Sequence, residues 1–137
     1  MNNFRVLLVD DEEDFLSTLV KRLKKRNLDV LAARNGTSAV EIVSAEPVDV
    51  VVLDLQMPDM DGLETLQRIK HVRPSAEVIM LTGHADVEVA LDGMEMGAFD
   101  YLLKPADIDE LVYKIQDAYK RKHCREENEK CRTPFDD

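Results

Sequence analysis

The chain has 137 residues and a mass of 15.6 kDa, which is the size of one compact domain and too short for two ordinary ones. Apolar residues make up 45% of the sequence and charged residues 34%, so the chain can bury a hydrophobic core and is not an intrinsically disordered tail. Its net charge of −10 repels the phosphates of nucleic acids, and we expect no direct nucleic-acid binding by this domain.

We also expect no membrane-spanning segment and no disulfide bond. The longest apolar runs, such as residues 6–9 and 48–53, are far shorter than the roughly 20 residues that span a bilayer, and the N-terminus has no signal-peptide pattern. We therefore expect a cytoplasmic protein with no membrane partner. Cys124 and Cys131 lie in a charged stretch and are expected to be reduced surface thiols. Together with His123 they still lack a fourth metal ligand.

The first half of the chain predicts strands and helices in alternation. A strand over residues 5–9 is followed by a helix with apolar residues at Phe15, Leu16, Leu19, Val20 and Leu23. A strand over residues 30–33 is followed by a helix that Thr37 or Ser38 can cap and that ends before Pro47. The third strand, residues 48–55, is apolar at nearly every position, which is typical of a parallel strand covered on both faces.

The second half continues the same alternation. The third helix has its apolar face at Leu63, Leu66, Ile69 and Val72. Strands over residues 77–81 and 99–103 flank a helix near residues 87–94, which Gly93 makes the weakest of the set. Asp107 can cap the last helix, whose apolar face is Ile108, Leu111, Val112, Ile115 and Tyr119. Five such units predict an α/β fold with a doubly wound, five-stranded parallel sheet.

The charged residues at the strand ends predict a binding site, because ligands of such sheets lie beyond the carboxyl ends of the strands. Acidic residues 10–13 follow the first strand, Asp54 lies in the third, Thr82 follows the fourth and Lys104 follows the fifth. Each can also have a purely structural role: Asp11 or Glu13 can cap a helix, and Lys104 can be a solvated loop charge. Asp54 interrupts an apolar stretch, where an unpaired buried charge costs several kcal/mol, so we expect a compensating cation.

The chemistry of these groups points to phosphoryl transfer. Crowded carboxylates repel one another, and a few hard oxygen ligands suit Mg²⁺ or Mn²⁺. A divalent ion with Lys104 and Thr82 nearby can stabilise a transferring phosphoryl group. The chain has no glycine-rich loop that would hold a nucleotide, so a small phosphodonor or a phosphoprotein fits better than ATP. The acidic first loop argues against a flavin mononucleotide site.

Four motifs in order resemble the receiver domain of two-component response regulators. They are Val9-Asp10-Asp11-Glu12, Leu53-Asp54-Leu55-Gln56-Met57-Pro58-Asp59-Met60-Asp61-Gly62, Leu81-Thr82-Gly83-His84 and Tyr101-Leu102-Leu103-Lys104-Pro105. The resemblance covers residues 4–122, nearly the whole chain, and implies a flavodoxin-like, (βα)5 three-layer sandwich similar to chemotaxis regulators. Residues 123–137 lose the apolar stripe, contain a helix-stopping Thr133-Pro134, and are expected to be a charged tail, a frayed helix end or a linker.

The resemblance also implies a role for each motif residue. Asp54 would accept the phosphoryl group, with Thr82 and Lys104 contacting phosphoryl oxygens. The metal ligands would be Asp10, largely through water, Asp11, Asp54 and the backbone carbonyl of Gln56. Thr82 and Tyr101 would change position as switch residues, and the bond between Lys104 and Pro105 would be cis. Gln56 and His84 occupy positions that tune the lifetime of the phosphoryl group in this family.

We therefore expect a phosphorelay signalling protein rather than an enzyme. A sensor histidine kinase or phosphotransfer protein would supply the phosphoryl group, and self-catalysed phosphorylation and dephosphorylation would switch control of a downstream output domain or protein. The face formed by the fourth helix, fifth strand and fifth helix would change partners and could form a homodimer. Two alternatives are a metal-dependent phosphohydrolase with an aspartyl-phosphate intermediate, which Gln56 in place of a second Asp disfavours, and a receiver-like module that binds partners without phosphorylation.

Overall fold

The computed structural model describes residues 4–56 and 61–128, in which strands and helices alternate as the sequence predicts. The elements are β1 (Arg5–Val9), α1 (Glu13–Lys24), β2 (Asp29–Ala33), α2 (Gly36–Ala45), β3 (Val50–Asp54), α3 (Gly62–Val72), β4 (Glu77–Thr82), the 3-10 turn η1 (His84–Asp86), α4 (Val87–Glu95), β5 (Asp100–Leu103) and α5 (Ile108–Asn128). The strands are parallel and ordered β2-β1-β3-β4-β5. The predicted doubly wound α/β fold is confirmed.

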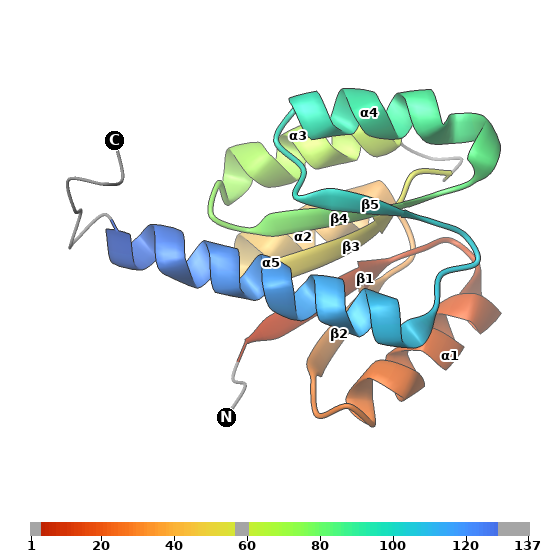
Figure 1. Cartoon of the computed structure of the whole chain (residues 1–137), viewed down its shortest axis with the longest axis horizontal. Coiled ribbons are helices and arrows are strands. Elements are labelled where there is room, and N and C mark those ends of the chain that lie inside the picture. The colour runs from red at the N-terminus through yellow and green to blue at the C-terminus, as the bar shows by residue number, and fades with distance from the viewer. Residues whose placement is uncertain (1–3, 57–60, 129–137) are drawn as a thin grey trace.

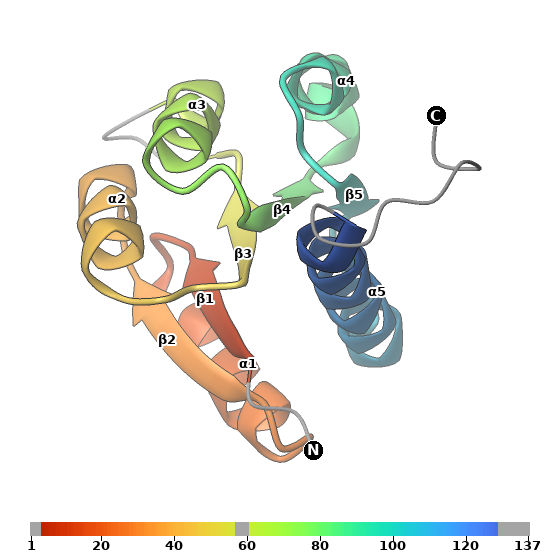
Figure 2. The same cartoon turned by 90° about the vertical axis from the view of Figure 1, so that its left-hand side faces the viewer.

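The sheet is covered by helices on both faces, which gives three layers (Figures 1 and 2). Side chains of successive strand residues point to opposite faces, so Val6 and Leu8 pack with α1 and α5, whereas Leu7 and Val9 pack with α2, α3 and α4. Each half of the core is built from Val, Leu and Ile at alternating strand positions. This is why the strand sequences read as continuous apolar runs rather than as an alternation of apolar and polar residues.

Local signals place most helix ends where we expected them. Asp107 caps α5, because its Oδ2 accepts a hydrogen bond of 3.3 Å from the amide of Glu110. The expected cap of α2 was wrong: Asn35 caps this helix, and its side chain accepts a 2.8 Å hydrogen bond from the amide of Ser38. Asn35 has the extended backbone that a capping residue needs, whereas residues 37 and 38 already lie inside the first turn.

Two glycines allow helices to approach the sheet closely. A Cβ at Gly62 would lie 2.9 Å from the Cα of Leu55, so α3 can begin directly against the segment that leaves β3. A Cβ at Gly93 would lie 2.4 Å from the sulfur of Met80, so α4 rests against β4. The glycine that weakened the prediction of α4 therefore lies in close contact with the Met80 side chain.

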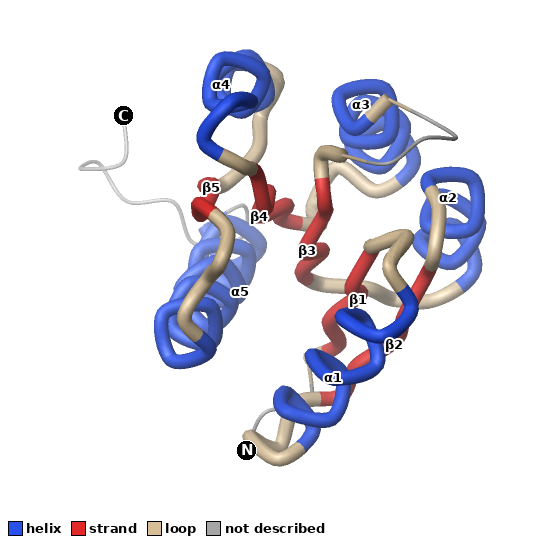
Figure 3. Tube along the Cα trace, turned by 90° about the vertical axis from the view of Figure 1, so that its right-hand side faces the viewer, coloured by secondary structure: helices blue, strands red, loops and turns tan. Residues whose placement is uncertain are grey.

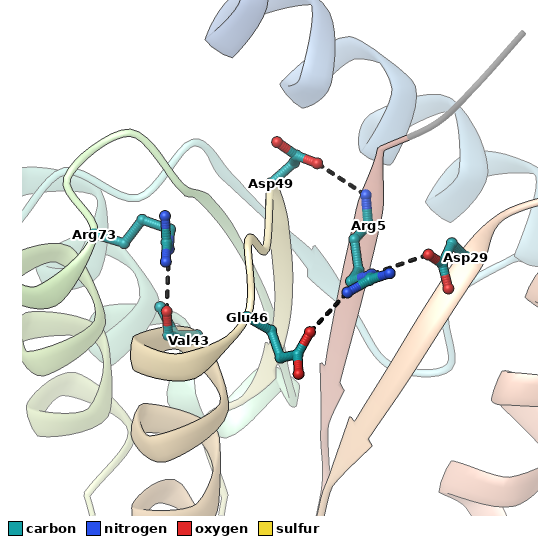
Figure 4. A network of polar contacts seen from close by, with 6 residues as sticks. All are labelled: Arg5, Asp29, Val43, Glu46, Asp49 and Arg73. Atoms are coloured by element: carbon teal, nitrogen blue, oxygen red, sulfur yellow. Dashed lines mark hydrogen bonds and ion pairs between the residues drawn. The ribbon is translucent and has the colours of Figure 1, made fainter.

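A polar network ties the amino-terminal edge of the sheet together (Figure 4). The guanidinium of Arg5 pairs with Asp29 at 2.9 Å and Glu46 at 2.8 Å, and the amide of Arg5 donates to Asp49 Oδ2 at 2.9 Å. The other oxygen of Asp49 pairs with Lys122 of α5 at 2.9 Å. The long last helix is thus anchored at the edge opposite the predicted site.

The last helix runs through Asn128 and includes residues 123–128, which the sequence assigned to a tail, a frayed helix end or a linker. Residues 129–137, with Cys131 and Thr133-Pro134, lie outside the described residues. Within the described part of the chain, none of the helices is both long enough and apolar enough to cross a bilayer.

Candidate phosphoryl-transfer site

The expected site residues gather at the carboxyl edge of the sheet. The chain leaves β1 and β5 on the same side of the molecule, on the right of Figure 1, and Figure 3 looks onto that edge. Asp10 and Asp11 follow β1, and Asp54 ends β3. One carboxylate oxygen from each of the three lies within 4.8 Å of the others. Three strand-end carboxylates that are far apart in sequence therefore form one cluster.

Asp54 is a buried carboxylate with a cation beside it. It is 2% exposed, and its Oδ1 lies 3.1 Å from the ammonium nitrogen of Lys104. The same oxygen accepts a 3.1 Å hydrogen bond from the amide of Gln56. Burial nevertheless raises the pKa of Asp54 above its usual value, because loss of water outweighs the contacts with the Gln56 amide and Lys104. Lys104 therefore offsets the buried charge of Asp54 only in part.

Asp10 is buried with one oxygen lacking a hydrogen bond. The carboxylate is 3% exposed, and Oδ1 accepts a 2.9 Å hydrogen bond from the amide of Glu12. Oδ2 has no hydrogen-bond partner, and its nearest cation is the Lys104 ammonium at 3.7 Å. A buried carboxylate oxygen without a partner, beside two further carboxylates, fits a hard cation that takes oxygen ligands.

Thr82 and Tyr101 lie on neighbouring strands next to the cluster. Thr82 ends β4 and is fully buried, and its hydroxyl donates a 3.3 Å hydrogen bond to the carbonyl of Gly83. Tyr101, in β5, is half-buried and packs against the core on the α2, α3 and α4 face. The peptide bond between Lys104 and Pro105 is cis. The backbone of β5 thus delivers Lys104 to Asp54 while Thr82 is bonded within its own loop.

Two contacts at this edge were missed by sequence reasoning. The side-chain amide of Gln56 donates to the carboxylate of Asp86 in η1, which connects the segment after β3 with the segment after β4. The ammonium of Lys104 also lies over the ring of Phe15 in α1. Phe15 was expected in the apolar stripe of its helix, but it is 38% exposed and so is not a core residue. A single sequence gives no signal for either pairing, because the partners are distant in the chain.

The arrangement suits transfer of a phosphoryl group to a carboxylate. Asp54 offers a nucleophile, Lys104 offers positive charge for phosphoryl oxygens, and the remaining carboxylates can hold a cation. The family model for the response regulator receiver domain matches residues 6–116. The chain belongs to the response regulator receiver family.

Individual relatives agree with this assignment. The chain is 38% identical over 130 residues, 93% of its length, to a putative NtrX-like response regulator of Rickettsia bellii. It is 34% identical over 123 residues, 90% of its length, to the regulatory protein AtoC of Escherichia coli. A response regulator receiver domain of Clostridium thermocellum superposes with a TM-score of 0.85 at 35% identity, covering 88% of this chain and 98% of that one.

Each of the two curated relatives is much longer than this chain, which spans 27% of its length. The matched region of this chain is a response regulator receiver domain. These findings do not favour the alternative function, a metal-dependent phosphohydrolase.

Proposed function

We propose that Asp54 is the phospho-acceptor of this receiver domain. The observation that carries the proposal is the contact between the buried Asp54 carboxylate and the Lys104 ammonium, at 3.1 Å, beside the carboxylates of Asp10 and Asp11. The donor would be the phosphohistidine of a sensor histidine kinase or a phosphotransfer protein. We place the reaction in the cytoplasm, where ATP charges such kinases.

The geometry leaves one oxygen of Asp54 for the reaction. Oδ1 is engaged by the Gln56 amide and by Lys104, so Oδ2 attacks phosphorus. The bond between phosphorus and the imidazole nitrogen of the donor breaks, and its electron pair stays with the imidazole. Lys104 then pairs with a phosphoryl oxygen, which places positive charge where negative charge develops. Because these groups belong to the receiver itself, a small phosphodonor can replace the kinase.

We assign the cation to the cluster of Asp10, Asp11 and Asp54, with the backbone carbonyl of Gln56 as a further ligand. Mg²⁺ or Mn²⁺ bound there would offset the negative charge of the carboxylates and of the phosphoryl oxygens. The unpartnered Oδ2 of Asp10 supports this assignment. Asp10 also contacts the Lys104 ammonium, at 3.7 Å, so the lysine lies between two of the carboxylates.

Phosphorylation would change the surface at α4, β5 and α5. Thr82 would turn its hydroxyl from the Gly83 carbonyl to a phosphoryl oxygen, and Tyr101 would move into the space that Thr82 leaves. Large apolar side chains already lie exposed on this face, Leu91 of α4 at 51% and Tyr113 of α5 at 66%. Such a surface fits a homodimer contact or a downstream output domain or protein.

Phosphorylation by a small donor tests the acceptor directly. Incubation with acetyl phosphate and Mg²⁺ is expected to add a phosphoryl group to the wild type, detected by intact mass, and to leave Asp54→Asn unmodified. Asp14→Asn is the matched control, because Asp14 is an exposed carboxylate at the start of α1, and it is expected to label like the wild type. Full labelling of Asp54→Asn would remove Asp54 from this role.

A further inference from the structure

Phe15 is an aromatic residue of α1 that is not fully buried in the core. The buried face of α1 is formed by Leu16, Leu19 and Leu23, whereas Phe15 is 38% exposed. An exposed phenylalanine costs hydration free energy without contributing a full core contact. Part of its ring is therefore available for a contact at the surface of the site.

The ring of Phe15 closes one side of the Lys104 ammonium. The ammonium nitrogen lies 3.1 Å from Asp54 Oδ1, 3.7 Å from Asp10 Oδ2 and 5.4 Å from the centre of the Phe15 ring. The Lys104 side chain is partly exposed, at 26%. The ring thus lies beside the one catalytic group of the site that retains access to solvent.

Two physical effects make this contact useful. The face of an aromatic ring carries partial negative charge and attracts an ammonium group within about 6 Å. Phe15 also lines a surface groove together with the exposed carboxylates of Glu12, Glu13 and Asp14. Without the ring this attraction to the ammonium is lost, and the flexible side chain of Lys104 is held less firmly at Asp54.

We propose that Phe15 is a positioning residue for phosphoryl transfer, which holds Lys104 over the acceptor through the face of its ring. The inference rests on the proposed role of Asp54 as phospho-acceptor. During the reaction Lys104 moves its contact from Asp54 Oδ1 to a phosphoryl oxygen. The ring is the partner that does not change in this step, because it is neither a metal ligand nor a reacting group.

The contact itself can be tested without metal or phosphodonor. A proton held over an aromatic face experiences the ring current, so the terminal methylene protons of Lys104 are expected to resonate upfield of their usual position in the wild type and in Phe15→Tyr. In Phe15→Leu, which keeps apolar bulk but has no ring, the upfield shift is expected to disappear. An unshifted Lys104 in the wild type would overturn the inference.

The function of the contact is tested by rates of phosphorylation with acetyl phosphate at fixed Mg²⁺. In this reaction the Asp54 oxygen bonds to phosphorus, and the bond from phosphorus to the acetate oxygen breaks with its electron pair leaving on acetate. Phe15→Leu is expected to lower the second-order rate constant about fivefold, within the range of such contacts, and Phe15→Tyr to restore it. Val72→Ala, at an apolar residue that is 40% exposed near the end of α3, is the control and is expected to match the wild type.

A double-mutant cycle separates positioning from a general structural effect. In a Lys104→Met background the ring has no ammonium to hold, so adding Phe15→Leu is expected to change the rate constant no further. A fivefold effect that persists in this background, or a Phe15→Leu variant as fast as the wild type, would refute the role of Phe15. Failure of the wild type itself to be labelled would instead refute the proposed phospho-acceptor, and the inference with it.

Discussion

Replacing Asp11 by Asn is expected to stabilise the domain when no divalent cation is present. One oxygen each of Asp10, Asp11 and Asp54 lies within 4.8 Å of the others. At that separation two unit charges repel by about 0.9 kcal/mol at the dielectric constant of water and by about 3.5 kcal/mol at an effective dielectric of 20. Asp11 takes part in two such pairs and is only half-buried, so the water-like value applies best and the gain is about 2 kcal/mol.

This gain can be measured as a melting temperature in EDTA. The entropy of unfolding is about 2.1 cal/mol/K per residue. For 137 residues, each kcal/mol of added unfolding free energy therefore raises the melting temperature by roughly 3 °C. Asp11→Asn is thus expected to melt about 6 °C above the wild type. The order is expected to reverse in Mg²⁺, because the wild type gains about 2.7 kcal/mol at 100 times its dissociation constant and the variant binds the ion more weakly.

Asp14→Asn is the matched control for that measurement. It removes one negative charge from a chain of net charge −10 at an exposed position of α1. Relief of overall repulsion alone would make both variants equally stable. Repulsion within the cluster predicts that only Asp11→Asn gains substantially. An Asp11→Asn variant that melts below the wild type in EDTA would refute the reasoning.

Three further outcomes follow from the structure. Burial raises the pKa of Asp54, so ionisation of this carboxyl destabilises the fold as pH rises through that pKa. Thermal melting in EDTA is therefore expected to show a higher melting temperature for Asp54→Asn than for the wild type, by a margin that is small at pH 4 and grows toward pH 8. Gly62→Ala would place a Cβ 2.9 Å from the Leu55 Cα, and urea unfolding is expected to show a loss of about 1 to 3 kcal/mol. Thr82→Ala is expected to accept a phosphoryl group but to lose the amide NMR shifts that beryllofluoride causes at residues 84–105 in the wild type; identical shifts in both proteins would contradict this coupling.

Most of the fold could be predicted because its signals are local. Each strand lies within two residues of its expected limits, since buried parallel strands are marked by runs of Val, Leu and Ile. The cap of α2 was misplaced because Asn35, Thr37 and Ser38 can all cap a helix, and only the backbone conformation of Asn35 decides among them. Residue type alone gives only the preference of Asn, Thr and Ser for the capping position. It does not give the backbone conformation of each residue.

The candidate site was predictable in outline and not in its contacts. The rule that ligands lie beyond the carboxyl ends of parallel strands is enough to bring Asp10, Asp54 and Lys104 together. The position of Phe15 could not be predicted, because a phenylalanine in the apolar repeat of a helix is expected to lie in the core. Only the structure shows that this ring is partly exposed and lies beside Lys104.

The charge balance of the site suggests how the proposed phosphorylation of Asp54 would affect the surface. An acyl phosphate on Asp54 carries more negative charge than the carboxylate and adds oxygens that need donors, while Lys104 already serves two carboxylates. The hydroxyl of Thr82 holds only a long, 3.3 Å bond to a neighbouring carbonyl, so it is the donor that changes partner at least cost. Thr82 leads through η1 into α4, whose buried residues are only Ala90 and Gly93. A helix with so little buried apolar surface is held weakly, and we expect it to be the first element to respond.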